Sequence, residues 1–425
     1  MRIRLDYGRD GLEVDLPDDN VVHTLSHQKA DPLTDPAASI DQVLRCPTGT
    51  KPLVELARGR RDACILICDI TRPVPNEIIL RPLLLQLEAA GIARDSIRIL
   101  IATGAHRADT DDEMVEMVGA HVAENYRVEN HDGDDLDAHT YLGRSPRGVP
   151  MWIDSRYLEA DLKITTGLIE PHFMAGFSGG RKVICPGIAA LETIKVWHGP
   201  DLLEDPRADT GILDGNPVHE ENTWIAQRAG CDFIVNAVID PARRPLCFVA
   251  GDMLAAFHEG VDFVRNLVID TLPSPVDIVV TSGAGYPLDM TFYQTVKGMC
   301  SALPIIKQGG TVIVAASMSE GIGSESFQQL FQDHTSLDGF IERLLRGNYF
   351  MMDQWQLEKM AAICRKAKVK VVTDGLPAEQ INRLFVESAP SVENAVAEAL
   401  VDHGPFATIA VSPRGPYVVG QIAAR

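Results

Sequence analysis

The sequence predicts an α/β protein with two α/β domains, mostly parallel sheets and an active site in the cleft between the domains. Short apolar runs alternate with longer stretches of helical pattern in both halves of the chain, as in parallel sheets covered by helices. The 425 residues are enough for two to three domains of about 150 residues. Polar and basic residues directly follow several predicted strands, at the edge where such sheets bind ligands.

The N-terminal domain is predicted to cover residues 1–270. Alternation of apolar and polar residues around a glycine-containing turn predicts a hairpin over residues 3–16. Thr110 and Glu113 have the spacing of a capping box, which predicts the start of a helix. Apolar runs predict four parallel strands at Ala63–Cys68, Ile97–Ala102, Leu162–Thr166 and Phe233–Ile239.

A second domain is predicted over residues 276–403, after the linker-like sequence DTLPSP at 270–275. Residues 404–425 are expected to form a strand and a loop that return to the N-terminal domain. Apolar runs in the second domain predict strands at Val276–Val280, Thr311–Ala315 and Lys370–Val372.

Composition excludes some classes of protein. Lys plus Arg is 39 and Asp plus Glu is 59, so the formal net charge is −20, which argues against nucleic-acid binding as the main function. The first residues, MRIRLDYG, carry charges where a signal peptide is apolar, and no apolar run reaches the roughly 18 residues of a membrane helix. The 8 cysteines contain no Cys-x-x-Cys pair. We therefore expect a cytoplasmic protein without nucleic-acid or membrane partners.

Polar residues follow three of the predicted strands at their ends. The sequences are DITRPVP at 69–75, TGAHR at 103–107, and a long glycine-rich segment at 167–187. Because the carboxyl ends of parallel strands lie at one edge of a sheet, their side chains should converge there. The converging set is Asp69, Arg72, His106, His172 and Lys182, with His198 after the next helix.

Each of these segments also has an ordinary structural interpretation. Asp69 has the position of a helix cap, and a single loop histidine is usually a surface residue. The sequence SGGRK at 178–182 is similar to a phosphate-binding loop, but it matches neither the Walker pattern nor GxGxxG. The occurrence of His, Arg or Lys in all three loops favours a functional site over packing.

These residue types suit a reaction on a small carboxylic acid. Two histidines on opposite sides of one atom can exchange the roles of acid and base. Arginine binds a carboxylate with two parallel hydrogen bonds, and a buried lysine with a lowered pKa can form a covalent bond. His198 is a candidate ligand for nickel, copper or zinc.

The second domain contributes the sequence PLDMTFYQTVKG at 287–298. Tyr293, Gln294 and Lys297 lie within about one helical turn, so they can share one face and close the cleft. An amphipathic helix with a solvated lysine explains the same pattern. Trp355 is the type of residue more often found in helix packing.

The loops together resemble the nickel-dependent lactate racemase family, which contains racemases and epimerases of 2-hydroxy acids. The resemblance covers essentially the whole chain. Its motifs are DITRP, TGAHR, PHFMAGFSGGRK, the segment around His198, GNPVHE at 215–220, and YQTVKG at 293–298.

The resemblance implies a nickel-pincer nucleotide, a nicotinate-derived mononucleotide whose ring carbon and two sulfur atoms hold nickel. It also implies hydride abstraction to a 2-keto acid and return of the hydride to the opposite face. The implied acid/base pair is His106 and His172, the tether is Lys182 and the nickel ligand is His198. Arg72 and Lys297 match substrate-binding groups, with Tyr293, Gln294 and Trp355 as further pocket contacts. Asp69 and Thr71 are expected to contact the cofactor or orient other groups, and Ser178, Gly179 and Gly180 to approach the nucleotide.

The motifs do not identify the substrate, because the common residues recognise only a carboxylate and a hydroxyl. The implied partners are a small 2-hydroxy acid and the enzymes that synthesise the cofactor. Two alternatives remain. One is a zinc hydrolase built on His106, His172 and His198, and the other is a non-catalytic carrier of the nucleotide.

Overall fold

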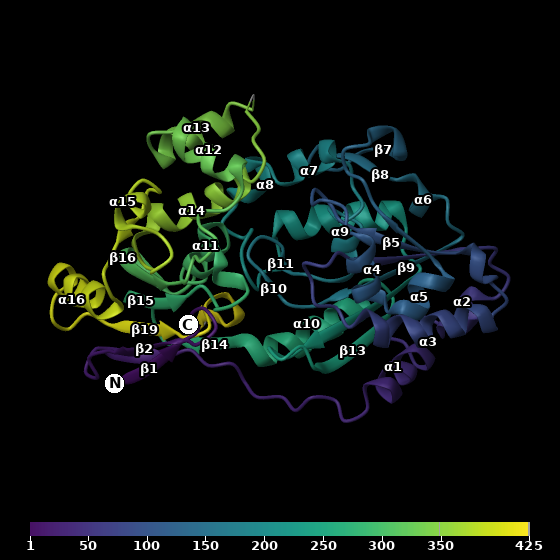
Figure 1. Ribbon diagram of the computed structural model, residues 1–425, viewed down its shortest axis with the longest axis horizontal. Coiled ribbons are helices and arrows are strands. Elements are labelled where there is room, and N and C mark those ends of the chain that lie inside the picture. The colour runs from purple at the N-terminus through teal and green to yellow at the C-terminus, as the bar shows by residue number, and fades with distance from the viewer. Residues whose placement is uncertain (348, 424–425) are drawn as a thin grey trace. The chain divides into compact units, whose positions relative to one another are not determined.

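The computed structural model describes residues 1–347 and 349–423. The chain divides into two compact units, which we call the β4 unit and the β15 unit after one strand of each. The β4 unit contains Lys29–His198 and Ile212–Asn266, and the β15 unit contains Met1–Gln28, Gly199–Gly211 and Leu267–Arg425. Both units are mixed α/β structures with mostly parallel sheets, as predicted (Figure 1).

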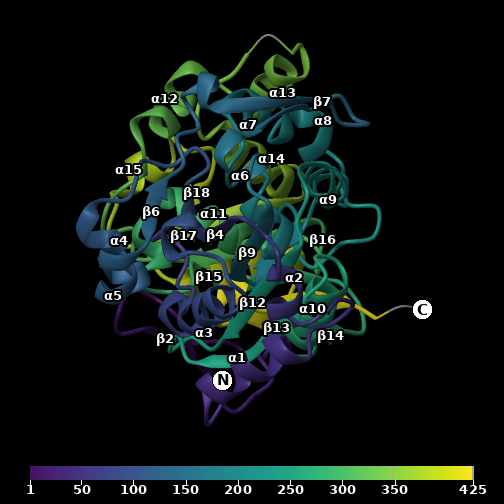
Figure 2. The same ribbon diagram turned by 90° about the vertical axis from the view of Figure 1, so that its right-hand side faces the viewer.

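The described part of the β4 unit is built on a six-stranded sheet. Its strands are parallel except for the edge strand β13, which runs antiparallel to β12. Figure 2 shows β4, β9 and β12 close together in this sheet. The spatial order is β13 (Pro245–Gly251), β12 (Phe233–Ile239), β9 (Leu162–Leu168), β4 (Ala63–Cys68), β5 (Ile97–Ala102) and β6 (Arg127–Asn130).

The described part of the β15 unit contains a second six-stranded sheet, in which all paired neighbours are parallel. Its order is β18 (Glu387–Ser388), β17 (Ala367–Val372), β16 (Ile306–Ala315), β15 (Val276–Ser282), β19 (Ile409–Ser412) and β3 (Val21–Thr24). Among the described residues, four two-stranded pairs lie outside the two large sheets. In the β15 unit, β1 (Arg2–Leu5) pairs with β2 (Leu12–Asp15), and β14 (Ile269–Leu272) pairs with β20 (Val419–Ile422). In the β4 unit, β7 (His139–Arg144) pairs with β8 (Pro150–Asp154), and β10 (Pro171–His172) pairs with β11 (Gly176–Phe177).

Helices connect the strands in both units. Within residues 1–347 and 349–423, no helix is long and apolar enough to cross a membrane. The β4 unit contains α1 (Pro36–Arg45), α2 (Leu53–Ala57), α3 (Asn76–Ala89), α4 (Asp111–Val118), α5 (Ala120–Asn125), α6 (Ser155–Leu158), α7 (Leu191–Trp197), α9 (Pro217–Ala229) and most of α10 (Ala255–Val268). The β15 unit contains α8 (Pro200–Leu203), α11 (Phe292–Cys300), α12 (Glu325–Asp333), α13 (Leu337–Leu345), α14 (Gln354–Lys366), α15 (Ala378–Ile381) and α16 (Val392–His403).

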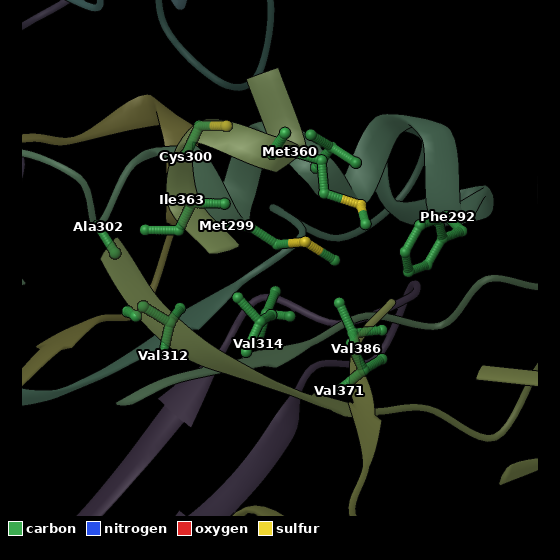
Figure 3. Packing of buried hydrophobic residues seen from close by; sticks show 14 of the residues in the cluster. Phe292, Met299, Cys300, Ala302, Val312, Val314, Met360, Ile363, Val371 and Val386 are labelled. Atoms are coloured by element: carbon green, nitrogen blue, oxygen red, sulfur yellow. The ribbon is translucent and has the colours of Figure 1, made fainter. Parts of the chain in front are cut away.

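The local sequence explains these elements. The residues of β4 are an unbroken apolar run that is almost completely buried, as expected for a central parallel strand. The predicted capping box opens α4, because Thr110 and Glu113 exchange side-chain and backbone hydrogen bonds. In the β15 unit, Phe292 and Met299 of α11 pack with Val314 of β16 in a buried cluster (Figure 3). The packing of these buried strands and helices fixes the positions of the strand ends from which the loops extend.

The units differ from the predicted domain boundaries at both ends of the chain. Strand β3 pairs with β19, so the N-terminal 28 residues belong to the β15 unit. Residues 404–425 do not return to the N-terminal domain, because β19 also pairs with β15 and β20 pairs with β14. The predicted linker at 270–275 begins inside β14. The reason is that both ends of the chain are strands that complete sheets of the β15 unit, a long-range pairing that local sequence does not reveal.

Candidate functional site

Three neighbouring strands of the β4 unit carry the predicted site loops. Strand β4 pairs in parallel with β5 on one side and β9 on the other. Their carboxyl ends therefore lie at one edge of the sheet, as the sequence predicted. The loop after β4 carries Asp69 and Arg72, the loop after β5 carries His106, and the loop after β9 leads to His172 and Lys182.

Asp69 and His106 form a hydrogen-bonded pair across two of these loops. The His106 Nδ1 lies 2.5 Å from the Asp69 Oδ2. Asp69 is buried, and its other oxygen accepts a hydrogen bond of 2.6 Å from the Thr71 hydroxyl. Burial raises the pKa of Asp69, but hydrogen bonds from His106 and Thr71 lower it more, so the net pKa is below its usual value. Thr71 thus holds the carboxylate that contacts His106.

Arg72 lies between the first and third loops. Its Nε is 3.6 Å from Glu170 Oε1, and its side chain is 36% exposed. The positive charge of Arg72 also helps to lower the pKa of Lys182, which places the two side chains in one electrostatic environment. A guanidinium at this edge suits a carboxylate ligand.

Lys182 and His198 are half-buried polar side chains. Burial lowers the pKa of Lys182 to about 7, with further lowering by Arg72 and Arg181. The Lys182 Nζ lies 4.9 Å from the centre of the Trp197 ring. Burial lowers the pKa of His198 to about 3, and the charges of Lys182 and His106 lower it further. At neutral pH much of Lys182 is an uncharged amine and His198 is a neutral imidazole, the forms needed for covalent attachment and metal binding.

His172 lies in a short hairpin after β9. Strands β10 and β11 pair His172 with Gly176. The His172 Nδ1 accepts hydrogen bonds from the backbone amides of Met174 and Ala175, at 3.3 and 3.2 Å. The hairpin therefore fixes the ring of His172 through its own backbone.

The loop of residues 178–180 makes contacts that differ from a phosphate cradle. The Ser178 hydroxyl donates to the Leu168 carbonyl at 2.7 Å, and the Ser178 amide donates to the Glu170 carbonyl. The Gly180 amide donates to Asn236 Oδ1 at 3.0 Å. A Cβ on Gly179 would lie 2.8 Å from a side-chain carbon of Ile169. Small residues are needed here for close packing, and the amides of Ser178 and Gly180 already have partners.

The predicted residues of the second domain lie in the β15 unit. Tyr293, Gln294 and Lys297 are on α11, and Trp355 is on α14. The Trp355 Nε1 donates to the Tyr293 hydroxyl at 3.2 Å, so these two helices hold an aromatic pair together. Trp355 is buried, in agreement with the packing role that its residue type favours. Lys297 lies on the same helix as Tyr293 and Gln294.

A metal or cofactor requires donors of suitable chemistry. Among the described residues, no group of three or more His, Cys, Asp or Glu side chains is arranged to hold a metal ion. A pincer nucleotide requires one amine for its tether and one protein ligand for nickel, and Lys182 and His198 fit these two requirements by charge state and by their mutual electrostatic influence.

Sequence reasoning missed three partners of the site. Glu170 pairs with Arg72, Trp197 lies beside Lys182, and Asn236 holds the amide of Gly180. Glu170 and Trp197 are adjacent in sequence to recognised motif residues, so this adjacency could have identified them as candidates for the site. Asn236 lies in the middle of the apolar strand β12, where a fully buried amide indicates a hydrogen-bonding role.

Comparisons with known proteins agree on one family. The lactate racemase N-terminal domain matches residues 7–211, and the lactate racemase C-terminal domain matches residues 272–419. A lactate racemase from Thermoanaerobacterium thermosaccharolyticum is 36% identical over 423 residues, covering 98% of each chain. A lactate racemase from Lactiplantibacillus plantarum is 35% identical over 424 residues, covering 98% of this chain and 99% of that one.

Solved structures show the same relationship. The lactate racemase apoprotein from T. thermosaccharolyticum superposes with a TM-score of 0.93 at 34% identity, and covers 99% of this chain and 100% of its own. A protein from Thermotoga maritima has a TM-score of 0.68 at 17% identity, covers 93% of this chain and 100% of its own, and shares the fold alone. Because the sequence match extends over nearly the full length and both domain models match in order, the chain belongs to the lactate racemase family.

Proposed function

We propose that the protein is a racemase of a 2-hydroxy acid, with lactate as the first substrate to test because its relatives are lactate racemases. The observation that carries the proposal is the grouping in the β4 unit. The Asp69–His106 pair follows two neighbouring strands, and His106, Lys182 and His198 share one electrostatic environment. A proton-transferring group, a neutral amine and a neutral metal ligand are the parts that such a reaction requires.

Lys182 and His198 are the residues that would hold a nickel-pincer nucleotide. Lys182 is the candidate for the covalent tether because its lowered pKa makes the amine nucleophilic near neutral pH. His198 is the candidate nickel ligand because its imidazole is neutral at that pH. When bound, the nucleotide supplies an acceptor for the hydride on the substrate Cα, which avoids forming a carbanion.

The protein's own groups bind the substrate and transfer its hydroxyl proton. His106 and His172 are the proposed acid and base, each serving the hydroxyl of one enantiomer. Arg72 is the proposed partner of the substrate carboxylate. Loss of the hydroxyl proton and of the hydride would leave a 2-keto acid, and racemisation would be completed when the hydride returns to the opposite face of Cα and a proton returns to the oxygen. Lys297, Tyr293 and Gln294 remain predicted substrate contacts, and Trp355 a predicted pocket contact.

The proposal also covers the cellular location and the substrate range of the enzyme. We place the protein in the cytoplasm, together with the enzymes that synthesise the nucleotide. Epimerisation of other 2-hydroxy acids is included in the proposal, because a carboxylate and a hydroxyl are the only groups that the predicted binding residues recognise.

The test is loss of optical purity by cofactor-loaded protein in deuterated water. Single-enantiomer lactate and a panel of other 2-hydroxy acids are incubated separately and analysed by chiral chromatography and mass spectrometry. We expect the opposite enantiomer to form without deuterium at C2, because transfer of the C2 hydrogen as a hydride would keep it from exchanging with solvent protons. The Lys182→Ala variant is the matched inactive control.

Two results would overturn the proposal. Formation of the opposite enantiomer with deuterium at C2 would indicate proton abstraction from Cα. Retention of optical purity by every substrate, although mass spectrometry shows the nucleotide attached, would support the carrier alternative.

A further inference from the structure

His106 and His172 have opposite kinds of hydrogen-bond partner at the same ring nitrogen. The Nδ1 of His106 faces the Asp69 carboxylate at 2.5 Å, and a carboxylate only accepts hydrogen bonds. Asp69 is ionised at neutral pH, since its pKa lies below the usual value despite its burial. The Nδ1 of His106 therefore carries a proton. In the neutral ring the Nε2 of His106 then has a free lone pair.

His172 shows the reverse arrangement. Its Nδ1 accepts from two backbone amides, those of Met174 and Ala175. An amide N–H only donates, so the Nδ1 of His172 must be unprotonated, and in the neutral ring the Nε2 carries the proton. The hairpin that holds these amides has little freedom, because a Cβ at Gly176 would lie 2.1 Å from the Ile212 carbonyl oxygen. Gly176 itself has a φ of 74°, which other residues adopt at a cost.

We propose that the two histidines rest in opposite tautomers, and that Asp69 is the positioning residue that makes His106 the proton acceptor. In the neutral rings, His106 presents an Nε2 lone pair, whereas His172 presents an Nε2–H group. The tautomers follow from the hydrogen bonds alone. Their consequence for catalysis rests on the proposed function.

The consequence is that the first half-reaction differs between the two enantiomers. When the substrate hydroxyl faces His106, the Nε2 lone pair can accept its proton directly. The hydroxyl proton moves to the His106 Nε2, and a bound nucleotide would supply the acceptor for the hydride and its two electrons. A substrate whose hydroxyl faces His172 must wait until the His172 proton moves from Nε2 to Nδ1, which displaces the amides of Met174 and Ala175. Because the equilibrium constant of a racemisation is one, steady-state kcat/KM stays equal for the two enantiomers, so the first turnover is the direct measure of the difference.

The first test measures the tautomers directly, without cofactor or turnover. Nitrogen-15 NMR distinguishes protonated from unprotonated ring nitrogens in protein labelled at histidine, at a pH well above the ordinary histidine pKa of about 6.5. Signals are assigned from the loss of peaks in His106→Ala and His172→Ala. We expect a protonated Nδ1 in His106 and a protonated Nε2 in His172. The same tautomer in both residues would overturn the proposal.

The second test changes the positioning residue. In Asp69→Asn the Thr71 hydroxyl, which now donates to Oδ1 at 2.6 Å, should hold the remaining carbonyl oxygen, so the new amide faces the His106 Nδ1. An amide that donates to Nδ1 moves the His106 proton to Nε2. We expect this shift in the spectrum of Asp69→Asn, with the His172 signals unchanged. The matched control is Asp109→Asn, which alters another buried carboxylate nearby and should leave both tautomers as they are.

Single-turnover kinetics with loaded protein connects the tautomers to catalysis. Asp69→Asn should slow oxidation of one enantiomer about 10²–10⁴-fold, the contribution of a general base, and should slow the other much less. Equal slowing of both enantiomers would overturn the catalytic part of the proposal, and thermal unfolding of the variant shows whether it folds. If the tautomers are found but no substrate racemises, the proposed function fails while the tautomer assignment stands.

Discussion

The loop at residues 69–72 directly follows β4, and the loop at residues 178–180 follows the β10–β11 hairpin that comes after the neighbouring strand β9, but the polar groups of the two loops have different partners. In the first loop, Asp69 and Arg72 direct their side chains to His106 and Glu170, which belong to other loops of the site. In the second loop, Ser178 and Gly180 bond to the backbone of Leu168 and Glu170 and to the buried Asn236. The first loop contacts His106, the proposed acid/base residue, and the second is packed tightly next to Lys182.

This difference shows that a position at a strand end and a role in chemistry are separate properties. A strand end places a residue near the site, but hydrogen-bond partners decide whether its polar groups are available to a ligand. Substitutions in the two groups of residues should therefore have different effects on cofactor attachment, metal content and stability.

Replacement of Lys182 should abolish both the covalent cofactor and the activity. Lys182→Ala removes the amine, and Lys182→Arg keeps a positive charge but provides a group that is protonated at all relevant pH values. Intact-protein mass spectrometry after exposure to the cofactor-synthesising enzymes should show the adduct in the native protein and in neither variant. An adduct that persists in either variant would place the tether on another residue.

Replacement of His198 should reduce nickel content strongly while the fold remains stable. We expect His198→Ala to lose most bound nickel, because His198 is the proposed protein ligand of the metal. Metal analysis per chain is the measurement, with thermal unfolding measured in parallel. His121→Ala, which removes an exposed histidine of α5, is the control and should keep its nickel. Equal nickel in both variants would remove His198 from the site.

The pKa of the Lys182 amine should also lie far below that of an ordinary lysine. A lysine amine reacts only when neutral, and burial lowers the pKa of Lys182 from 10.5 to about 7. In protein without cofactor, the rate of modification by a small amine-reactive reagent should therefore rise with pH and level off above about 7. Peptide mass spectrometry measures this rate, with exposed lysines of the same protein as internal references. A rate at Lys182 that keeps rising toward pH 10 would contradict the lowered pKa.

Much of the fold was predictable from sequence because the central strands are unbroken apolar runs. Strands β4, β5 and β12 lie where the sequence placed them, and β9 extends two residues further. The chain ends were predicted incorrectly, because β3 and β19 are short and are stabilised by pairing with strands distant in the sequence. Local pattern contains no information on such pairs.

For the candidate site, the sequence predicted which loops come together but not the hydrogen-bond partners of individual atoms. The convergence of the loops after β4, β5 and β9 follows from a parallel sheet, so Asp69 and His106 were correctly expected to lie near each other. The partners of individual atoms were not predictable. No pattern indicates that two backbone amides bind the Nδ1 of His172, or that Asn236 occupies the amide of Gly180. These contacts depend on distances of a few tenths of an ångström.

The smallest expected effect tests whether residues 178–180 form a packed loop or an anion cradle. Gly179 has a φ of 99°, and a Cβ there would lie 2.8 Å from Ile169. Gly148 has a φ of 86° with nothing within 4 Å of its Cβ position, so Gly148→Ala reports backbone strain alone. Strain of this kind costs about 1–3 kcal/mol, and the clash at Gly179 adds to it. In denaturant unfolding of protein without cofactor, Gly179→Ala should therefore lose more stability than Gly148→Ala. Equal losses, with cofactor binding impaired only in Gly179→Ala, would instead assign the loop to anion binding.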